Sequence, residues 1–158
     1  MNIKSIVRFL LSIALPVAVG AVAGLFTASS VKTWFVTLNK PSFNPPSWLF
    51  APVWTTLYIM MGIAFFIIWQ SKANEIIKKR AMKLYFIQLF FNFTWSFVFF
   101  YAQQPGWAVV NIIFLWLLIA VTPFWFSRIS KVAAGLLVPY ILWVSFATAL
   151  NYAIWQLN

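Results

Sequence analysis

The 158-residue sequence contains no cysteine, no histidine and a single acidic residue, Glu75. Without cysteine or histidine, the chain cannot form a disulfide, a typical zinc site, a thiol nucleophile or a Ser-His-Asp triad. With one carboxylate, it also lacks the paired acids of a glycosidase and a carboxylate relay for protons. These absences exclude most conventional enzyme classes, and we expect no bound metal and no cofactor.

Charge of either sign is scarce. Charged residues make up 8% of the chain, against about 25% in a typical soluble domain. Hydrophobic residues make up 64%, which indicates a protein that folds in a membrane. The eleven lysines and arginines give a formal net charge of +10, but they lie between long apolar runs instead of forming a basic stripe. We therefore expect no nucleic-acid partner.

Five apolar stretches are each long enough to cross a bilayer core about 30 Å thick, which takes about 20 helical residues. They predict an all-α fold, an integral membrane bundle of five transmembrane helices that forms a single domain over residues 1–158. The predicted helices span approximately residues 6–27, 47–69, 84–101, 107–127 and 132–155. The first stretch also contains Ala21-Val22-Ala23, which resembles a signal-peptide cleavage site. A retained helix is favoured, because the apolar run continues on both sides of this triplet.

Lysine and arginine are unequally divided between the two sides of the predicted bundle. Nine of them lie in the amino-terminal segment and in the second and fourth connections, and only Lys32 and Lys40 lie on the other side. Cytoplasmic loops of membrane proteins carry an excess of these residues. The distribution predicts a multi-pass protein of the cell membrane with its amino end in the cytoplasm and its carboxyl end outside.

The first connection, residues 29–46, is long for a loop between bundled helices. It contains Trp34, Phe35, Phe43 and three prolines, and prolines limit the freedom of a loop. Two interpretations remain open. The segment is either a lid over the mouth of the bundle, or an interfacial segment whose rings lie at headgroup level.

Helical spacing places aromatic rings and amides on shared faces of four predicted helices. Stripes of this kind are typical of plain helix packing. Uncharged amides among the rings favour a binding pocket instead, because a pocket uses such groups to orient a flat apolar ligand. The candidate residues from these faces are Tyr58, Asn92, Trp95, Trp107, Trp143, Ala147, Leu150 and Asn151.

Three segments carry a family resemblance. Residues 34–46 read WFVTLNKPSFNPP, residues 51–58 read APVWTTLY, and residues 146–152 read FATALNY. They resemble the translocator protein or tryptophan-rich sensory protein family (TspO/MBR, also called the peripheral benzodiazepine receptor family), in its bacterial form. The resemblance implies a five-helix bundle, usually a homodimer, with a pocket covered by the first loop. It also implies ligands such as protoporphyrin IX, benzodiazepines and isoquinoline carboxamides, and cholesterol in animal members.

The resemblance adds site residues and one departure. The positions that match the family pocket are Trp48, Ala51, Asn92, Trp95, Trp107, Trp143, Ala147 and Leu150, with Trp34 in the covering loop. The sterol-recognition pattern of the family requires a basic residue after Tyr152, but Gln156 stands at that position. Such patterns are weak even when complete, so we expect weak or no cholesterol binding.

The main hypothesis is a membrane receptor or sensor that binds porphyrins and benzodiazepine or isoquinoline carboxamide-type ligands in an aromatic pocket. The absence of histidine agrees with a metal-free porphyrin, because the chain offers no strong axial ligand. The first alternative is light-dependent degradation of protoporphyrin IX, with Trp48 and Trp143 as electron donors. The second is transport of a tetrapyrrole or lipid, which ranks last because the sequence shows no convincing internal repeat.

Overall fold

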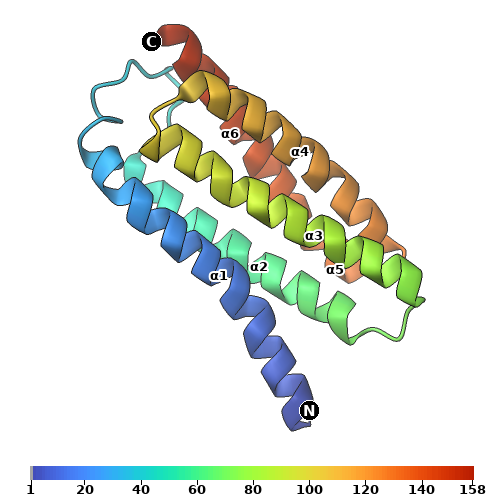
Figure 1. The fold of residues 1–158 in the computed structure, drawn as a ribbon. Helices are drawn as coiled ribbons and strands as arrows, with labels where there is room; N and C mark the ends of the chain where they lie inside the picture. The colour runs from blue at the N-terminus through green and yellow to red at the C-terminus, as the bar shows by residue number, and fades with distance from the viewer. Residues whose placement is uncertain (1) are drawn as a thin grey trace.

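The computed structural model describes residues 2–158, and Figure 1 shows its helices running side by side. The helices are α1 (Ile3–Lys32), α2 (Phe50–Gln70), α3 (Glu75–Ser96), α4 (Pro105–Ser127), α5 (Lys131–Gly135) and α6 (Val138–Leu157). A short 3₁₀ helix, Ser47–Leu49, leads into α2, and a π-helical turn, Phe97–Tyr101, ends the third span. Within residues 2–158, five helical segments are long and apolar enough to cross a membrane. The predicted all-α bundle with five transmembrane helices is confirmed.

Polar caps extend two helices beyond the apolar runs. The Asn2 side chain accepts a hydrogen bond from the Ser5 amide at 2.9 Å, which starts α1 ahead of the apolar stretch. The Asn74 side chain accepts one from the Ile76 amide at 2.9 Å, so α3 starts at Glu75, well before the expected residue 84. Such caps satisfy amide groups that have no partner within the helix. Because α1 also continues to Lys32, the irregular first connection covers residues 33–46 instead of 29–46.

The fifth span is interrupted, whereas the hydropathy pattern predicts one helix over residues 132–155. The regular α-helical hydrogen-bond pattern changes to a turn at Leu136 and Leu137, between α5 and α6, although both residues keep right-handed helical backbone angles. Pro139 explains the position of the break, because its ring nitrogen cannot donate a hydrogen bond to the Gly135 carbonyl. It lies instead in the first turn of α6, where a missing amide hydrogen costs little.

The helices form a ring in which α1 packs against α2, α3 against α4, and α4 against α6. Gly62 allows a close approach of α1 and α2, because a Cβ atom at this position would lie 2.7 Å from the Cα atom of Ile13. Gly20 on α1 serves a different purpose, since a Cβ atom there would overlap the ring of Tyr58. The small residues therefore set both the distance between α1 and α2 and the position of one buried ring.

The two ends of the bundle differ in their connections. Figure 1 shows the N-terminus, the α2–α3 connection and the start of α5 at one end. The C-terminus, the first loop and the α3–α4 connection lie at the opposite end. The nine basic residues of the amino-terminal segment and of the second and fourth connections therefore share one end.

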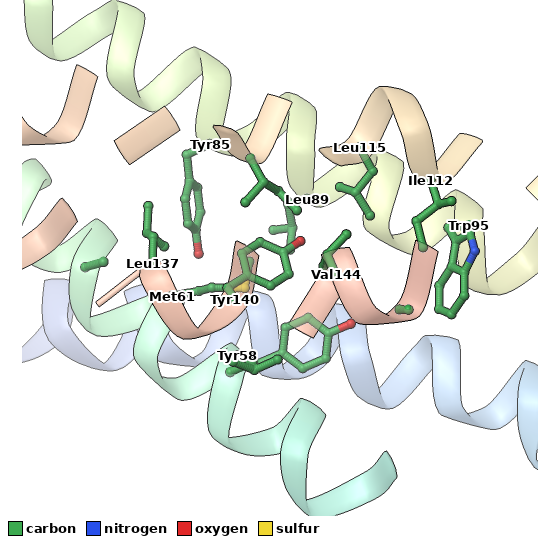
Figure 2. Close-up of a cluster of buried hydrophobic side chains, with 14 of the residues drawn as sticks. Tyr58, Met61, Tyr85, Leu89, Trp95, Ile112, Leu115, Leu137, Tyr140 and Val144 are labelled. Carbon is green, nitrogen blue, oxygen red and sulfur yellow. The ribbon is translucent and has the colours of Figure 1, made fainter. Parts of the chain in front are cut away.

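The core runs along the axis of the ring. Its largest fully buried side chains include Met61, Tyr85, Phe126 and Tyr140, which come from four different helices. Figure 2 shows part of this core, with the rings of Tyr58, Tyr85 and Tyr140 in the interior of the bundle. The buried polar residues are serines, a threonine and the amides Gln88, Asn92 and Asn151.

Candidate ligand-binding site

A small aromatic cavity lies between α2, α3 and α6 at the end of the bundle that carries the first loop. Its volume is about 20 Å³, which is room for about one water molecule. Eight of its twelve lining residues are aromatic. The lining residues are Phe35, Phe50, Trp54, Trp95, Phe99, Phe100, Trp143, Phe146, Ala147, Leu150, Asn151 and Ile154.

The rings themselves fill the space. Trp54 stacks on Tyr58 at 5.6 Å and lies 6.2 Å from Trp95, measured between ring centroids. Trp143 lies 5.4 Å from Phe146 and 6.2 Å from Phe50. These separations are typical of favourable aromatic pairs. The cavity is therefore small because its walls pack against one another.

A hydrogen-bonded network lies directly below the cavity. The Tyr58 hydroxyl donates to Asn92 Oδ1 at 2.6 Å, and Asn92 Nδ2 donates to the Tyr140 hydroxyl oxygen at 3.0 Å. The Tyr140 hydroxyl in turn donates to Gln88 Oε1 at 2.8 Å. Asn92 is fully buried, and inside a membrane protein such polar groups are costly unless paired. The network therefore joins α2, α3 and α6, and it occupies both polar ends of the Asn92 amide.

Asn151 lies in the cavity wall and is also paired. Its Oδ1 accepts a hydrogen bond from Trp95 Nε1 at 3.0 Å, and its Nδ2 donates to the Pro105 carbonyl at 3.0 Å. Trp143 differs, because its Nε1 atom is buried and has no hydrogen-bond partner within residues 2–158. A buried donor without a partner costs free energy. Trp143 is thus a wall residue whose N–H group has no acceptor within the described part of the chain.

The structure brings five of the predicted site residues together in the cavity wall: Trp95, Trp143, Ala147, Leu150 and Asn151. Tyr58 and Asn92 lie immediately below it, in the hydrogen-bonded network.

The remaining four predicted residues line other grooves and depressions of the molecule. Trp48 is 72% exposed and lines an outer groove of about 680 Å³ between α2 and α6, which Trp143 also lines. Trp107 is 69% exposed, and with Trp34 it lines an outer depression beside the first loop. Ala51 faces a groove between α1 and α2.

Several wall residues are absent from the predicted set. Phe146 follows Trp143 by three positions, so helical spacing supplied a signal for it. Phe99 follows Trp95 by four positions, so helical spacing supplied a signal for it as well, but its sequence neighbour Phe100 also lines the cavity. The π-helical turn Phe97–Tyr101 contains both rings. Such a turn adds a residue to the helical repeat, and a regular 3.6-residue pattern does not reveal it.

The first loop covers the cavity and is tied to the end of α6. Phe35 is 3% exposed and lies in the cavity wall. The Asn39 amide donates to Asn158 Oδ1 at 2.9 Å, and Asn158 Nδ2 donates to the Asn39 carbonyl at 3.0 Å. A third, longer hydrogen bond runs from Asn39 Nδ2 to the Leu157 carbonyl at 3.3 Å. We call this set of three hydrogen bonds the Asn39–Asn158 latch.

A second space lies next to the cavity, in the groove between α1 and α2. Its volume is about 480 Å³. Five aromatic residues, among them Trp54 and Trp95, line both the groove and the cavity, so they form the wall between the two spaces. Lys32 is the only charged residue among the groove-lining side chains. Lys40 is engaged elsewhere, because its Nζ atom donates to the Leu38 carbonyl at 3.0 Å.

The fold and the site together define an integral membrane protein with five spans and an aromatic interior. Residues 12–156 match the model of the TspO/MBR family. The chain belongs to the TspO/MBR family, which confirms the resemblance drawn from the sequence.

Relatives agree over most of the chain. It is 46% identical to the tryptophan-rich protein TspO of Chlorobaculum tepidum over 157 residues, which cover 98% of both chains. It is 39% identical to the human translocator protein over 126 residues, or 79% of this chain and 75% of the human one. It is 36% identical to the tryptophan-rich sensory protein of Cereibacter sphaeroides over 125 residues, which cover 79% of this chain and 77% of that protein. Family membership supports a role as a membrane sensor or receptor.

Proposed function

We propose that the protein is a membrane receptor or sensor that binds porphyrins such as protoporphyrin IX in the aromatic cavity. The observation that carries the proposal is the cavity wall, in which eight aromatic residues surround a space below the first loop. Flat aromatic ligands gain most from such walls, because stacked and edge-on rings attract one another beyond the area they bury. Benzodiazepine and isoquinoline carboxamide-type ligands share this flat, apolar character and would compete for the same site.

Binding requires the cavity to open. Ligand pockets usually enclose about 300–1,000 Å³, whereas the cavity holds about 20 Å³. The five aromatic side chains that separate the cavity from the α1–α2 groove offer the shortest way to enlarge it. If they rotate, the cavity and the groove of about 480 Å³ become one space. The first loop would have to give way as well, because Phe35 lines both spaces.

Two polar groups suit a porphyrin in the enlarged space. Trp143 Nε1 needs an acceptor, and a propionate or carbonyl oxygen of the ligand would supply one. Lys32 lies at the rim of the groove, where its ammonium group would pair with a propionate at the membrane surface. A metal-free ring fits a chain that contains no histidine.

Two substitutions on α6 test this site. Ala147 lines the cavity, whereas Ala149 is exposed on the opposite face of the same helix. Ala147→Phe fills the cavity and should weaken protoporphyrin IX binding at least about tenfold, the effect of an overpacking cost of about 1.4 kcal/mol. Ala149→Phe should change the affinity for protoporphyrin IX less than twofold. Quenching of tryptophan fluorescence by added protoporphyrin IX measures both affinities. Wild-type affinity in a folded Ala147→Phe variant would exclude the cavity as the site.

Light-dependent degradation of the porphyrin is a second candidate. Trp143 favours it, because this ring lines both the cavity and the outer groove where Trp48 lies. An indole in van der Waals contact with an excited porphyrin is placed to donate an electron. Absorption spectra of protoporphyrin IX under illumination, with wild type and with Trp143→Phe, distinguish the two functions. Equal bleaching rates with and without protein would leave binding alone.

We also propose that the protein pairs with a second copy of itself and binds cholesterol weakly or not at all. We expect a homodimer, which crosslinking in the membrane would detect as a single band of twice the monomer mass. We expect weak or no cholesterol binding, because Gln156 follows Tyr152 where a basic residue would complete the sterol pattern. Tight binding of cholesterol that depends on Tyr152 would contradict the second expectation.

A further inference from the structure

Two arginines from different helices share one indole ring at the basic end of the bundle. The guanidinium carbon of Arg80, on α3, lies 5.4 Å from the ring centroid of Trp125, on α4. That of Arg128, which follows α4, lies 5.6 Å from the same ring and 4.7 Å from the ring of Phe124. Because both arginines lie over one ring, their guanidinium carbons are at most about 11 Å apart.

No acid in the chain is placed to neutralise this pair. The only acidic residue is Glu75, and it lies five positions before Arg80 on α3. Five positions correspond to a rotation of about 140° around a helix, so the two side chains point to different sides. The indole attracts each guanidinium but does not cancel their mutual repulsion. The upper limit of about 11 Å on their separation is comparable to the screening length of about 8 Å at physiological salt, so an external anion that contacts both guanidinium groups would be stabilised.

The pair lies at the head of an apolar seam between α3 and α4. Arg80 and Trp125 meet at its upper end, and Phe91 and Phe114 meet eleven residues further along both helices, with ring centroids 6.3 Å apart. Eleven residues of helix rise about 16 Å, close to half of a bilayer core about 30 Å thick. The α4 side chains that flank the seam are apolar and exposed: Phe114, Leu117, Val121 and Phe124. The seam thus has the length and polarity of one lipid acyl chain.

We propose that Arg80, Arg128 and Trp125 form a binding site for the phosphate of an anionic phospholipid, with an acyl chain along the α3–α4 seam. Arginine suits this role, because its planar fork donates two parallel hydrogen bonds to phosphate oxygens. A headgroup without a cation of its own leaves the phosphate charge available to both arginines, whereas choline adds a competing positive charge. The site therefore selects phosphatidylglycerol over phosphatidylcholine.

The test counts lipids bound to the detergent-purified full-length protein by native mass spectrometry. The probes are phosphatidylglycerol and phosphatidylcholine with identical acyl chains. We expect the wild type to prefer phosphatidylglycerol on the order of tenfold, as charge-assisted hydrogen bonds allow. Arg80→Gln and Arg128→Gln should each remove most of this preference. The double variant should lose little more than either single one, because both side chains hold the same phosphate.

The matched control is Lys79→Gln with Lys83→Gln. These exposed residues lie on the same end of α3, and the double change removes the same charge without touching Trp125. The control variant should prefer phosphatidylglycerol over phosphatidylcholine to within twofold of the wild type. An equal loss in the control would show a diffuse basic surface and overturn the proposal. Displacement of phosphatidylglycerol by millimolar inorganic phosphate would overturn it too, because the site would then be one for free phosphate. Circular dichroism confirms that each variant is helical.

Discussion

The Asn39–Asn158 latch should control how fast a ligand reaches the cavity. The latch holds the first loop against the end of α6, and the closed cavity of about 20 Å³ admits no porphyrin. Asn158→Ala removes the two shorter hydrogen bonds of the latch. Only the long contact from Asn39 Nδ2 to the Leu157 carbonyl, at 3.3 Å, would remain.

The size of the effect follows from the exposure of these bonds. A hydrogen bond contributes about 0.5–1.5 kcal/mol net, and water replaces a lost partner at an exposed site. We assign about 0.5 kcal/mol to each of the two lost bonds, at the low end of that range. A total of about 1 kcal/mol raises the open population about fivefold. If opening of the loop precedes entry, the association rate of protoporphyrin IX should rise by the same factor.

Stopped-flow quenching of tryptophan fluorescence measures this rate. Gln156→Ala is the matched control, because Gln156 is an exposed amide two positions earlier and lies outside the latch. Hydrogen exchange at the Asn39 amide reports the latch itself and should accelerate in Asn158→Ala. Faster exchange with an unchanged association rate would refute the idea that the loop gates the cavity. Unchanged exchange would show that the latch does not stabilise the loop.

Three further predictions concern packing, the buried network and orientation. Gly62→Ala should lower the free energy of unfolding in detergent by about 2 kcal/mol relative to Gly24→Ala, because both gain helix propensity but only the first meets the α1 backbone, at 2.7 Å. Equal thermal midpoints would contradict this. Asn92→Ala should lower the free energy of unfolding by about 2–3 kcal/mol. Asn111→Ala should lower it less, because only Asn92 bridges two buried tyrosines. Equal resistance of the two variants to urea or heat would argue against a stabilising role of the network. Ser42→Cys introduces the only thiol of the chain, in the first connection, and this thiol should react with a membrane-impermeant maleimide added outside intact cells. If it does not react from outside, the proposed orientation is wrong.

The five spans were predictable because the bilayer imposes them. A helix that crosses an apolar layer needs about 20 apolar residues in a row, and this requirement leaves a plain record in the sequence. Prolines within the spans were harder to interpret. Pro123 lies inside α4 without interrupting it, whereas the fifth span breaks just before Pro139. Whether a proline bends or ends a helix depends on the neighbours that satisfy the freed carbonyl, and a single sequence does not identify them.

The candidate site was predictable in composition but not in its detailed contacts. Spacing correctly placed Trp143, Ala147 and Leu150 on one inward face of α6. The partners of Asn92 were not predictable, since Tyr58 and Tyr140 lie 34 and 48 positions away. The helical spacing suggested that the Asn92 amide contacts a ligand, but its Oδ1 and Nδ2 atoms are both hydrogen-bonded within the protein. The closure of the cavity depends on ring-to-ring packing, which is decided only when all helices are in place.

The network below the cavity also constrains how the protein is made. Tyr58 and Asn92 belong to α2 and α3, which leave the ribosome before α6 carries Tyr140 into the bundle. Domains of a growing chain form from the amino end onward. Until α6 arrives, Gln88 and the donor side of Asn92 face lipid or unfinished protein without their final partner, a costly state in an apolar medium. The last helix thus completes the assembly, and a nascent chain stalled before α6 presents unpaired amides that membrane quality control is able to recognise.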